Sequence, residues 1–349
     1  TTSPGEDLMR RDFTINAMAY NDTDGLIDLF GGMEDLEHKV IRCVGQAKDR
    51  FEEDALRMLR AVRFAGQLNF RIEHSTREAI AECHENLRDV SAERIQMELL
   101  KLLISDHPEI LKEAYATGLT GIFFPEFDRM METEQKNPHH CYSVGEHTLH
   151  AVRTIEPNPV LRLTMLLHDV GKPVTKTTDE YGIDHFYNHY KVGADMSKEI
   201  LKRLKFDNKT IQIVYQLISH HDIRFKDPKT NGRRHVRKVM HSIGPTLFPY
   251  LLKVMEADVR SQSEYYQAEK LSILKETWEA YEEILEEKDC LSLKDLKING
   301  NQLKALGIRE GKVIGAILNT LLSMVLEHPE LNEYSYLKEL ALKIYKQLR

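Results

Sequence analysis

The stretch LRLTMLLHDVGK, residues 161–172, joins an apolar helical pattern to two side chains of the kind that bind metals. Gly171 interrupts the pattern two residues after the pair His168 and Asp169. Imidazole nitrogens and carboxylate oxygens are common ligands of transition metals. The stretch therefore predicts a helical protein in which a buried helix ends in a metal-binding pair.

Other residues of the same kinds extend this pair. Of the 16 histidines, 11 lie between His139 and His241, where even spacing would put about five. Several lie on different predicted helices, so a helical bundle could bring them to one point. A mixed nitrogen and oxygen set suits Zn, Mn, Fe, Co or Ni, and such a metal activates water for hydrolysis. The candidate ligands are His147, His168, Asp169, His189, His220, His221 and Asp258. The alternative interpretation is a group of surface or capping histidines.

The order H…HD-x-G-K…H…HH…D resembles the HD-domain phosphohydrolase superfamily. This resemblance implies that one metal is held by His147, His168, Asp169 and Asp258. It implies that forms with two metals also use the intermediate histidines, here His189, His220 and His221. His168, Asp169 and Lys172 would form the catalytic centre, with Lys172 neutralising a phosphate. The other histidines of the region match no motif position and are expected to face solvent or substrate: His139, His140, His150, His185, His235 and His241.

A second group of chemically distinctive residues lies in EDALRMLRAVRF, residues 53–64. Asp54, Arg57, Arg60 and Arg63 recur every third residue, which on one helix gives a slowly winding stripe. A carboxylate with guanidinium groups can read the hydrogen-bonding edge of a base and hold phosphates. The alternative is the ordinary solvated face of an amphipathic helix.

This run follows RRDFTINA at residues 10–17 and DLFGG at residues 28–32. Together they resemble the bacterial-type tRNA nucleotidyltransferases, the CCA-adding enzymes, and the related poly(A) polymerases. The resemblance implies tRNA as partner, CTP and ATP as substrates, and Mg for nucleotidyl transfer. In the implied nucleotide site Arg11 contacts the nucleotide, Asp54 and Arg57 pair with the base, and Arg60 and Arg63 complete the pocket.

One element of that family is not found before Arg10. Its polymerase chemistry needs two carboxylates in a D-x-D that follows a Gly-Ser-type loop. Asp22 and Asp24 have this spacing, but their surroundings have the composition of a turn. We therefore expect a tRNA nucleotidyltransferase without most of its head domain, which does not add nucleotides by itself. The alternative functions are a metal-dependent phosphatase or cyclic phosphodiesterase acting on nucleotide or RNA ends, and an RNA-binding scaffold with both sites idle.

The fold class predicted is mainly α, a multi-domain helical body with a small β remnant at the N-terminus. We expect a head remnant over 1–48, a helical neck over 49–125, a linker over 125–142, a metal-binding helical domain over 138–290 and a tRNA-contacting helical segment over 291–349. Strands are expected at 26–30 and 40–44, and a loop or hairpin at 174–188. A basic strip over 222–241, with seven Lys and Arg against two Asp, could neutralise RNA phosphates.

Composition limits the remaining function classes. The 349 residues carry a formal net charge of −7, with 42% hydrophobic and 30% charged residues. No apolar run approaches the roughly 20 residues that cross a bilayer, so no membrane partner is expected. The four cysteines are scattered, which fits a reducing cytoplasm better than a disulfide scaffold.

Overall fold

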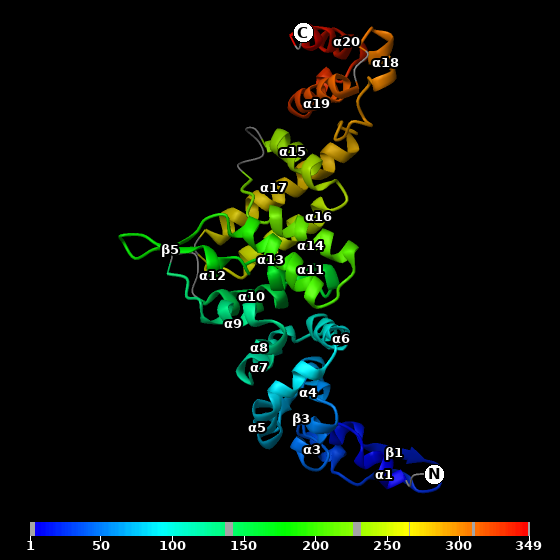
Figure 1. The fold of residues 1–349 in the computed structure, drawn as a ribbon, viewed down its shortest axis with the longest axis vertical. Coiled ribbons are helices and arrows are strands. Elements are labelled where there is room, and N and C mark those ends of the chain that lie inside the picture. The colour runs from blue at the N-terminus through cyan, green and yellow to red at the C-terminus, as the bar shows by residue number, and fades with distance from the viewer. Residues whose placement is uncertain (1–3, 137–141, 226–231, 265, 309–310, 348–349) are drawn as a thin grey trace. The chain divides into compact units, whose positions relative to one another are not determined.

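A computed structural model describes residues 4–136, 142–225, 232–264, 266–308 and 311–347, and these are mainly helical, as predicted (Figure 1). The chain divides into two compact units. The first contains residues 1–222 and 257–265, and the second contains residues 223–256 and 266–349. None of the helices in the described residues is long and apolar enough to cross a membrane.

The first unit begins with short elements built around two small sheets. They are α1 (Pro4–Met9), η1 (Thr14–Asn16), β1 (Met18–Asn21), β2 (Gly25–Asp28), α2 (Gly32–Glu37), β3 (Val40–Ile41) and β4 (Arg71–Ile72). β1 and β2 form an antiparallel hairpin, and β3 pairs with β4 in parallel. Asp24 lies in the hairpin turn, where its backbone N–H donates to Oδ1 of Asn21 at 2.6 Å. The D-x-D spacing of Asp22 and Asp24 is therefore that of a turn.

The helices that follow form the neck: α3 (Ala47–Glu53), α4 (Leu56–Leu68), α5 (His74–Cys83), η2 (His84–Asp89), α6 (Ala92–Leu103), η3 (Pro108–Ile110), α7 (Leu111–Ala116), α8 (Leu119–Phe123) and α9 (Pro125–Glu132). The helical neck expected over 49–125 is interrupted at Asp54, whose backbone is extended with φ −154°. Its Oδ1 accepts the N–H of Leu56 at 3.2 Å. Asp54 thus competes with the helical hydrogen bond and separates α3 from α4.

The expected linker over 125–142 is wrong in its first part, because α9 begins at Pro125. Proline is favoured in the first turn of a helix, where its missing N–H costs no hydrogen bond. Phe127 and Met130 are fully buried, and Phe127 stacks on Phe124 with ring centroids 5.7 Å apart. The later part of that segment, with His139 and His140, lies outside the described residues.

The remainder of the first unit is a helical bundle with one hairpin. It contains α10 (Val144–Thr154), α11 (Pro159–Leu167), α12 (Lys172–Thr175), β5 (Lys176–Thr178), β6 (Asp184–Phe186), α13 (His189–Arg203), α14 (Asn208–His220) and the end of α16 (Phe248–Arg260). A Cβ at Gly171 would lie 2.3 Å from the carbonyl oxygen of His189 and 2.7 Å from the N of Gly193. The turn after Asp169 therefore touches the backbone of α13, and only glycine allows that approach.

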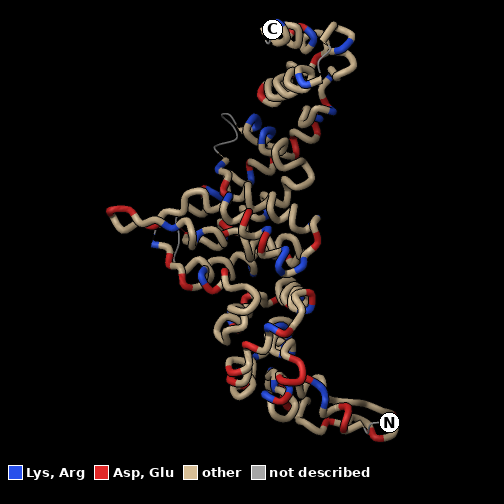
Figure 2. The backbone as a smooth tube through the Cα atoms, in the orientation of Figure 1, with Lys and Arg blue, Asp and Glu red and all other residues tan. Residues whose placement is uncertain are grey.

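The second unit contains α15 (Arg233–Ile243), the first part of α16, α17 (Gln267–Glu286), α18 (Gly300–Ala305), α19 (Gly311–Glu327), η5 (Pro329–Leu331) and α20 (Tyr334–Gln347). Figure 2 shows Lys and Arg along α15, within the expected basic strip. Arg237 lies 3.1 Å from Asp289, and Lys238 lies 2.6 Å from Glu327. Both side chains therefore pair with carboxylates of the second unit, which favours a structural role over RNA binding for this part of the strip. Residues 226–231 of the strip lie outside the described residues.

Candidate metal and nucleotide sites

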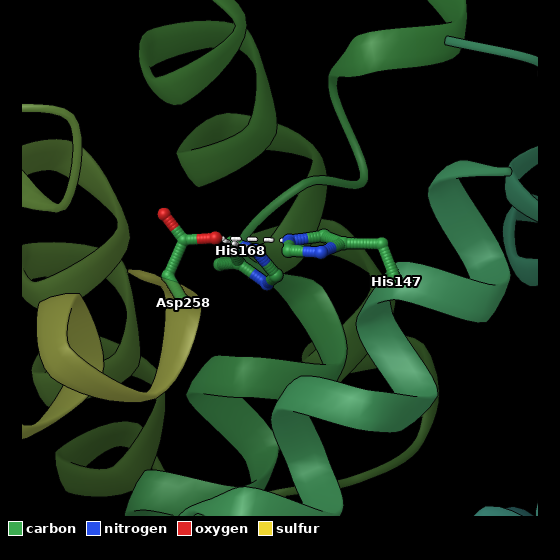
Figure 3. Close-up of side chains that lie close together, drawn as sticks. All are labelled: His147, His168 and Asp258. Atoms are coloured by element: carbon green, nitrogen blue, oxygen red, sulfur yellow. Dashed lines mark hydrogen bonds and ion pairs between the residues drawn. The ribbon is translucent and has the colours of Figure 1, made fainter. Parts of the chain in front are cut away.

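His147, His168 and Asp258 converge from three helices (Figure 3). His147 lies in α10, His168 directly follows α11, and Asp258 lies in the last turn of α16. The Nε2 of His147 is 2.9 Å from Oδ1 of Asp258, and the Nε2 of His168 is 3.6 Å from the same oxygen. Both imidazoles are fully buried. The arrangement is one in which a single cation could contact all three side chains.

Asp169, His189 and His221 form a second group of this kind. The Nε2 atoms of His189 and His221 are 3.3 Å apart, and Oδ1 of Asp169 lies 3.5 and 3.9 Å from them. The other oxygen of Asp169 is 3.3 Å from Nε2 of His168. Asp169 therefore faces both groups, and six of the seven predicted ligands come together.

Backbone carbonyls fix the orientation of the rings. Nδ1 of His168 is 2.7 Å from the oxygen of Met165, and Nδ1 of His221 is 2.7 Å from the oxygen of Ile218. The equivalent contacts of His189 and His147 are made to Phe186 at 2.8 Å and Ser261 at 3.2 Å. A carbonyl can only accept, so each Nδ1 carries a hydrogen, and Nε2 is the ring atom of each histidine that can bind a metal.

The inward-facing atoms fit a metal ion. Within the described part of the chain, the buried Nε2 of His168 has no hydrogen-bond partner. Burial disfavours the charged form of His168, but the carboxylates of Asp169 and Asp258 outweigh this and raise its pKa to about 10. Burial, with His168 and His189 nearby, lowers the pKa of His221 to about 3. The centre therefore attracts a cation and keeps His221 neutral, as a ligand must be.

Two predicted residues of this site have other roles in the structure. The Nζ of buried Lys172 lies 2.7 Å from Oδ2 of Asp169 and donates to Oε1 of Gln135 at 2.8 Å. Lys172 thus holds the carboxylate of Asp169. The Nδ1 of His220 contacts the carbonyl of Gln216 at 2.7 Å, and its ring belongs to neither ligand group.

The expected nucleotide residues surround a cavity of about 520 Å³ between the N-terminal segment and α4. Its lining is rich in arginine and comprises Arg10, Arg11, Asp12, Asn16, Asp54, Leu56, Arg57, Arg60, Phe64 and Arg94. Four of the five predicted nucleotide residues are among them. Arg63 is not, because three-residue steps drift by about 60° around a helix and carry it to another face. There its Nε lies 2.5 Å from Oε2 of buried Glu98.

Protein partners hold the recognition groups of this cavity. Arg60 donates from Nε and Nη2 to Oδ2 of Asp12 at 2.8 and 2.5 Å. Arg57 donates from Nη2 to the carbonyl oxygen of Arg10 at 2.9 Å and from Nη1 to Glu53 at 2.7 Å. The exposed guanidinium of Arg11 pairs with Asp7 at 2.8 Å. The arginines are therefore oriented before any ligand arrives.

Among the lining residues that the sequence did not predict, Asp12 and Arg94 form ion pairs with predicted ones. Asp12 belongs to RRDFTINA, and its distance of 48 positions from Arg60 hid their contact. Arg94 lies 40 positions after Asp54, and its Nη2 donates to Oδ2 of Asp54 at 2.8 Å. The available signal for Arg94 was its spacing of four residues from Glu98 within the expected helical neck.

Comparison with known proteins gives consecutive matches along the chain. Residues 1–42 match the poly A polymerase head domain, residues 69–131 match the probable RNA and SrmB-binding site of polymerase A, and residues 139–293 match the HD domain. The CC-adding tRNA nucleotidyltransferase of Thermus thermophilus is 31% identical over 332 residues, covering 91% of this chain and 72% of that protein. The chain belongs to the tRNA nucleotidyltransferase family.

Other members of the tRNA nucleotidyltransferase family align over shorter stretches. The A-adding enzyme of Deinococcus radiodurans is 34% identical over 264 residues, 72% of this chain and 59% of that protein. A CCA-adding enzyme of Lactobacillus delbrueckii is 54% identical over 116 residues, 33% of this chain and 29% of that enzyme. The chain thus spans less than a third of that relative.

A solved structure shares the fold of this tRNA nucleotidyltransferase family member. The CCA-adding enzyme of Bacillus stearothermophilus, in complex with CTP, matches 99% of this chain and 77% of its own, with a TM-score of 0.68 and 24% identity. The helical class and the HD-type bundle are therefore confirmed. Asp54, Arg57 and Arg60 lie between the first two matched ranges, so the cavity is built between two recognised parts of the chain.

Proposed function

We propose that this chain selects CTP and ATP for the synthesis or repair of the 3′ CCA end of tRNA. The observation that carries the proposal is the cavity in which Asp54 and Arg57 lie together, with Arg10 and Arg11 in the same lining. A carboxylate beside a guanidinium offers an acceptor next to donors, and the remaining arginines offer positive charge for a triphosphate. Family membership agrees with this chemistry.

One Asp–Arg pair suits both nucleotides. Cytosine and adenine each present an exocyclic amino donor beside a ring-nitrogen acceptor, whereas uracil and guanine present a carbonyl oxygen where the amino group would be. Asp54 would accept from the amino group, and Arg57 would donate to the ring nitrogen. Burial raises and the contact with Arg94 lowers the pKa of Asp54, which ends below its ordinary value. The carboxylate is therefore ionised at neutral pH and ready to accept.

The test is binding of CTP to the full chain, measured by calorimetric titration. Asp54→Asn replaces an acceptor by an amide of the same shape, and we expect CTP affinity to fall by about tenfold or more, since a hydrogen bond to a charged group is lost. Arg57→Gln should have a similar effect. Arg88→Gln is the control, because Arg88 is exposed and pairs only locally with Glu85 at 2.5 Å. Equal CTP affinity in all four proteins would refute the proposal.

Within this proposal the parts of the chain have separate roles. Residues 1–48 belong to the head, 49–125 read the nucleotide, 138–290 hold metal and 291–349 contact tRNA. Support for RNA binding comes from the family description of residues 69–131 and from the Thermotoga maritima CCA-adding enzyme, of similar fold, which is complexed with tRNA. Magnesium would serve nucleotidyl transfer, and the reducing cytoplasm remains the proposed location.

A second proposed activity is metal-dependent phosphohydrolysis of nucleotide or RNA ends. It is favoured by the two groups of inward-facing ligands, His147, His168 and Asp258 in one and Asp169, His189 and His221 in the other. A divalent metal such as Ni, Mn, Co or Zn would supply Lewis acidity and activate water there. The chain itself fixes each Nε2 through the carbonyl on Nδ1, and Lys172 fixes Asp169.

This second activity can be tested independently of nucleotide selection. The full chain is assayed for metal content and for hydrolysis of a 2′,3′-cyclic nucleotide. His168→Ala and Asp169→Ala should lose both, while His150→Ala, an exposed change on the helix of His147, should lose neither. Undiminished hydrolysis by a metal-free preparation would contradict the assignment.

A further inference from the structure

Helix α6 brings a second guanidinium to the carboxylate proposed to read the base. Arg94 lies in its first turn, lines the cavity, and donates from Nη2 to Oδ2 of Asp54 at 2.8 Å. The other oxygen of Asp54 accepts the backbone N–H of Leu56. Both oxygens are thus anchored, one to a cation and one to the start of α4, so the plane of the carboxylate is fixed.

Anchoring leaves the carboxylate able to accept from a base. An ionised carboxylate has about four lone-pair sites, of which these two contacts use two. Arg94 can therefore stay bound to Asp54 while an amino group of the base donates to a remaining site. With Arg94 in place the carboxylate of Asp54 stays ionised and directed at the position of the amino group. A base that presents a carbonyl oxygen at this position would be repelled by the negative charge.

The position of Arg94 is itself set by a buried ion pair one helical turn later. Glu98 follows Arg94 by four residues and accepts from Nε of Arg63 in α4 at 2.5 Å. Residues four apart share one face of a helix. The side chains of this second pair are 9% and 4% exposed. The buried pair therefore fixes the register of α6 on α4, and this register delivers Arg94 to Asp54.

We propose that Arg94 is a positioning residue that holds Asp54 for base recognition and thereby sets the preference for nucleotides with an exocyclic amino group over those with a carbonyl. The inference rests on the proposed function of the cavity. It adds that selectivity depends on a residue of α6 that need not touch the base.

The experiment compares binding of CTP and UTP to the full chain by calorimetric titration. For Arg94→Gln we expect CTP affinity to fall by about tenfold and the ratio of CTP to UTP affinity to fall by a similar factor. Arg94→Lys keeps a cation for the single contact made, so it should keep the ratio within about threefold of the unmodified chain. Arg88→Gln should leave both affinities unchanged, and melting temperatures show whether each variant is folded.

Each other outcome overturns a distinct claim. If Asp54→Asn loses CTP binding but Arg94→Gln keeps both affinities, the role of Arg94 is refuted and the proposed function stands. Equal losses for CTP and UTP with an unchanged ratio indicate a merely structural Arg94 and also refute the inference. If Arg94→Gln unfolds, the test rests on Arg94→Lys. A folded Arg94→Lys variant that has lost the preference for CTP over UTP would contradict the proposal that a cation at this position holds Asp54. Failure of the unmodified chain to bind CTP refutes the proposed function and the inference with it.

Discussion

The imidazole of His147 and the carboxylate of Asp258 meet at 2.9 Å although 111 positions separate them in the sequence. The same imidazole contacts the carbonyl oxygen of Ser261 through Nδ1 at 3.2 Å. The end of α16 is thus attached to α10 at two points, one on each nitrogen of a single ring. This double contact aims the ring at the centre of the candidate metal site.

Removal of metal should destabilise the first unit. Without a metal ion, the charges of Asp169 and Asp258 at this centre are offset only in part, by the ammonium of Lys172 beside Asp169 and by a proton on His168. We expect chelator-treated protein to melt several degrees below metal-loaded protein, because a ligand that binds only the folded state stabilises it. His168→Ala should melt at the same temperature with and without added metal, whereas His150→Ala should respond like the unmodified chain. An unmodified chain that contains metal, yet melts identically after its removal, would contradict this.

Gly171→Ala should disturb the metal site from a position that binds no metal. The new Cβ would lie 2.3 Å from the carbonyl oxygen of His189, a backbone atom that cannot move without displacing α13. We expect a loss of about 1–3 kcal/mol in the free energy of unfolding and weaker metal binding. Gly315→Ala is the matched control, because among the described residues a Cβ there meets no atom within 4 Å beyond its chain neighbours and the nearby backbone of its own helix, and alanine favours a helix. Equal unfolding and metal binding in the two variants would exclude the close approach.

The buried pair of Arg63 and Glu98 gives a test of the α4–α6 register. Glu98→Gln should lower the free energy of unfolding in urea by about 3–5 kcal/mol, since it leaves Arg63 charged and without its carboxylate in the interior. The double change Arg63→Met with Glu98→Leu should recover most of this loss. Arg88→Gln removes one side of the exposed ion pair with Glu85, and it should change the free energy of unfolding by less than about 1 kcal/mol. A double variant as unstable as Glu98→Gln would contradict the proposed cause.

Much of this architecture could be predicted from the sequence, since helix positions follow from local apolar spacing. The expected helical stretches over 49–125 and 138–290 contain α4 to α8 and α10 to α17, and the hairpin expected over 174–188 contains β5 and β6. The ligand types and their order likewise predicted six of the residues that converge. These features depend on residue type and spacing, which a single chain displays directly.

The remaining features depend on partners distant in the sequence. Arg63 fits the spacing of a nucleotide-facing stripe, but Glu98 on another helix binds it. Lys172 fits a phosphate-binding role, but Gln135 and Asp169 surround its ammonium group. The expected linker begins at Pro125, but this proline is the first residue of α9. For Arg63 and Lys172 a tertiary contact overrides the local pattern, whereas Pro125 follows the preference of proline for the first helical turn.

Asp184 should contribute stability that depends on pH. Burial disfavours its charge, but hydrogen bonds from the N–H of Lys136 and the hydroxyl of Thr178, with the ammonium of Lys176, lower its pKa to about 2. Its unfolded pKa is about 3.9, so the contribution is complete above roughly pH 5 and is lost as pH falls toward 2. We expect Asp184→Asn to melt below the unmodified chain at pH 6, with the gap closing by pH 2–3. A gap that stays constant with pH would show that the charge is not responsible.

We propose that CTP and ATP bind in one cavity, where Asp54 and Arg57 contact the base of either nucleotide. Its most direct test is a competition titration, in which the full chain is saturated with CTP and then titrated with ATP. We expect a single site per chain, with ATP displacing CTP completely and Asp54→Asn weakening the binding of both nucleotides together. Simultaneous binding of CTP and ATP, or unchanged binding of either nucleotide by Asp54→Asn, would contradict it.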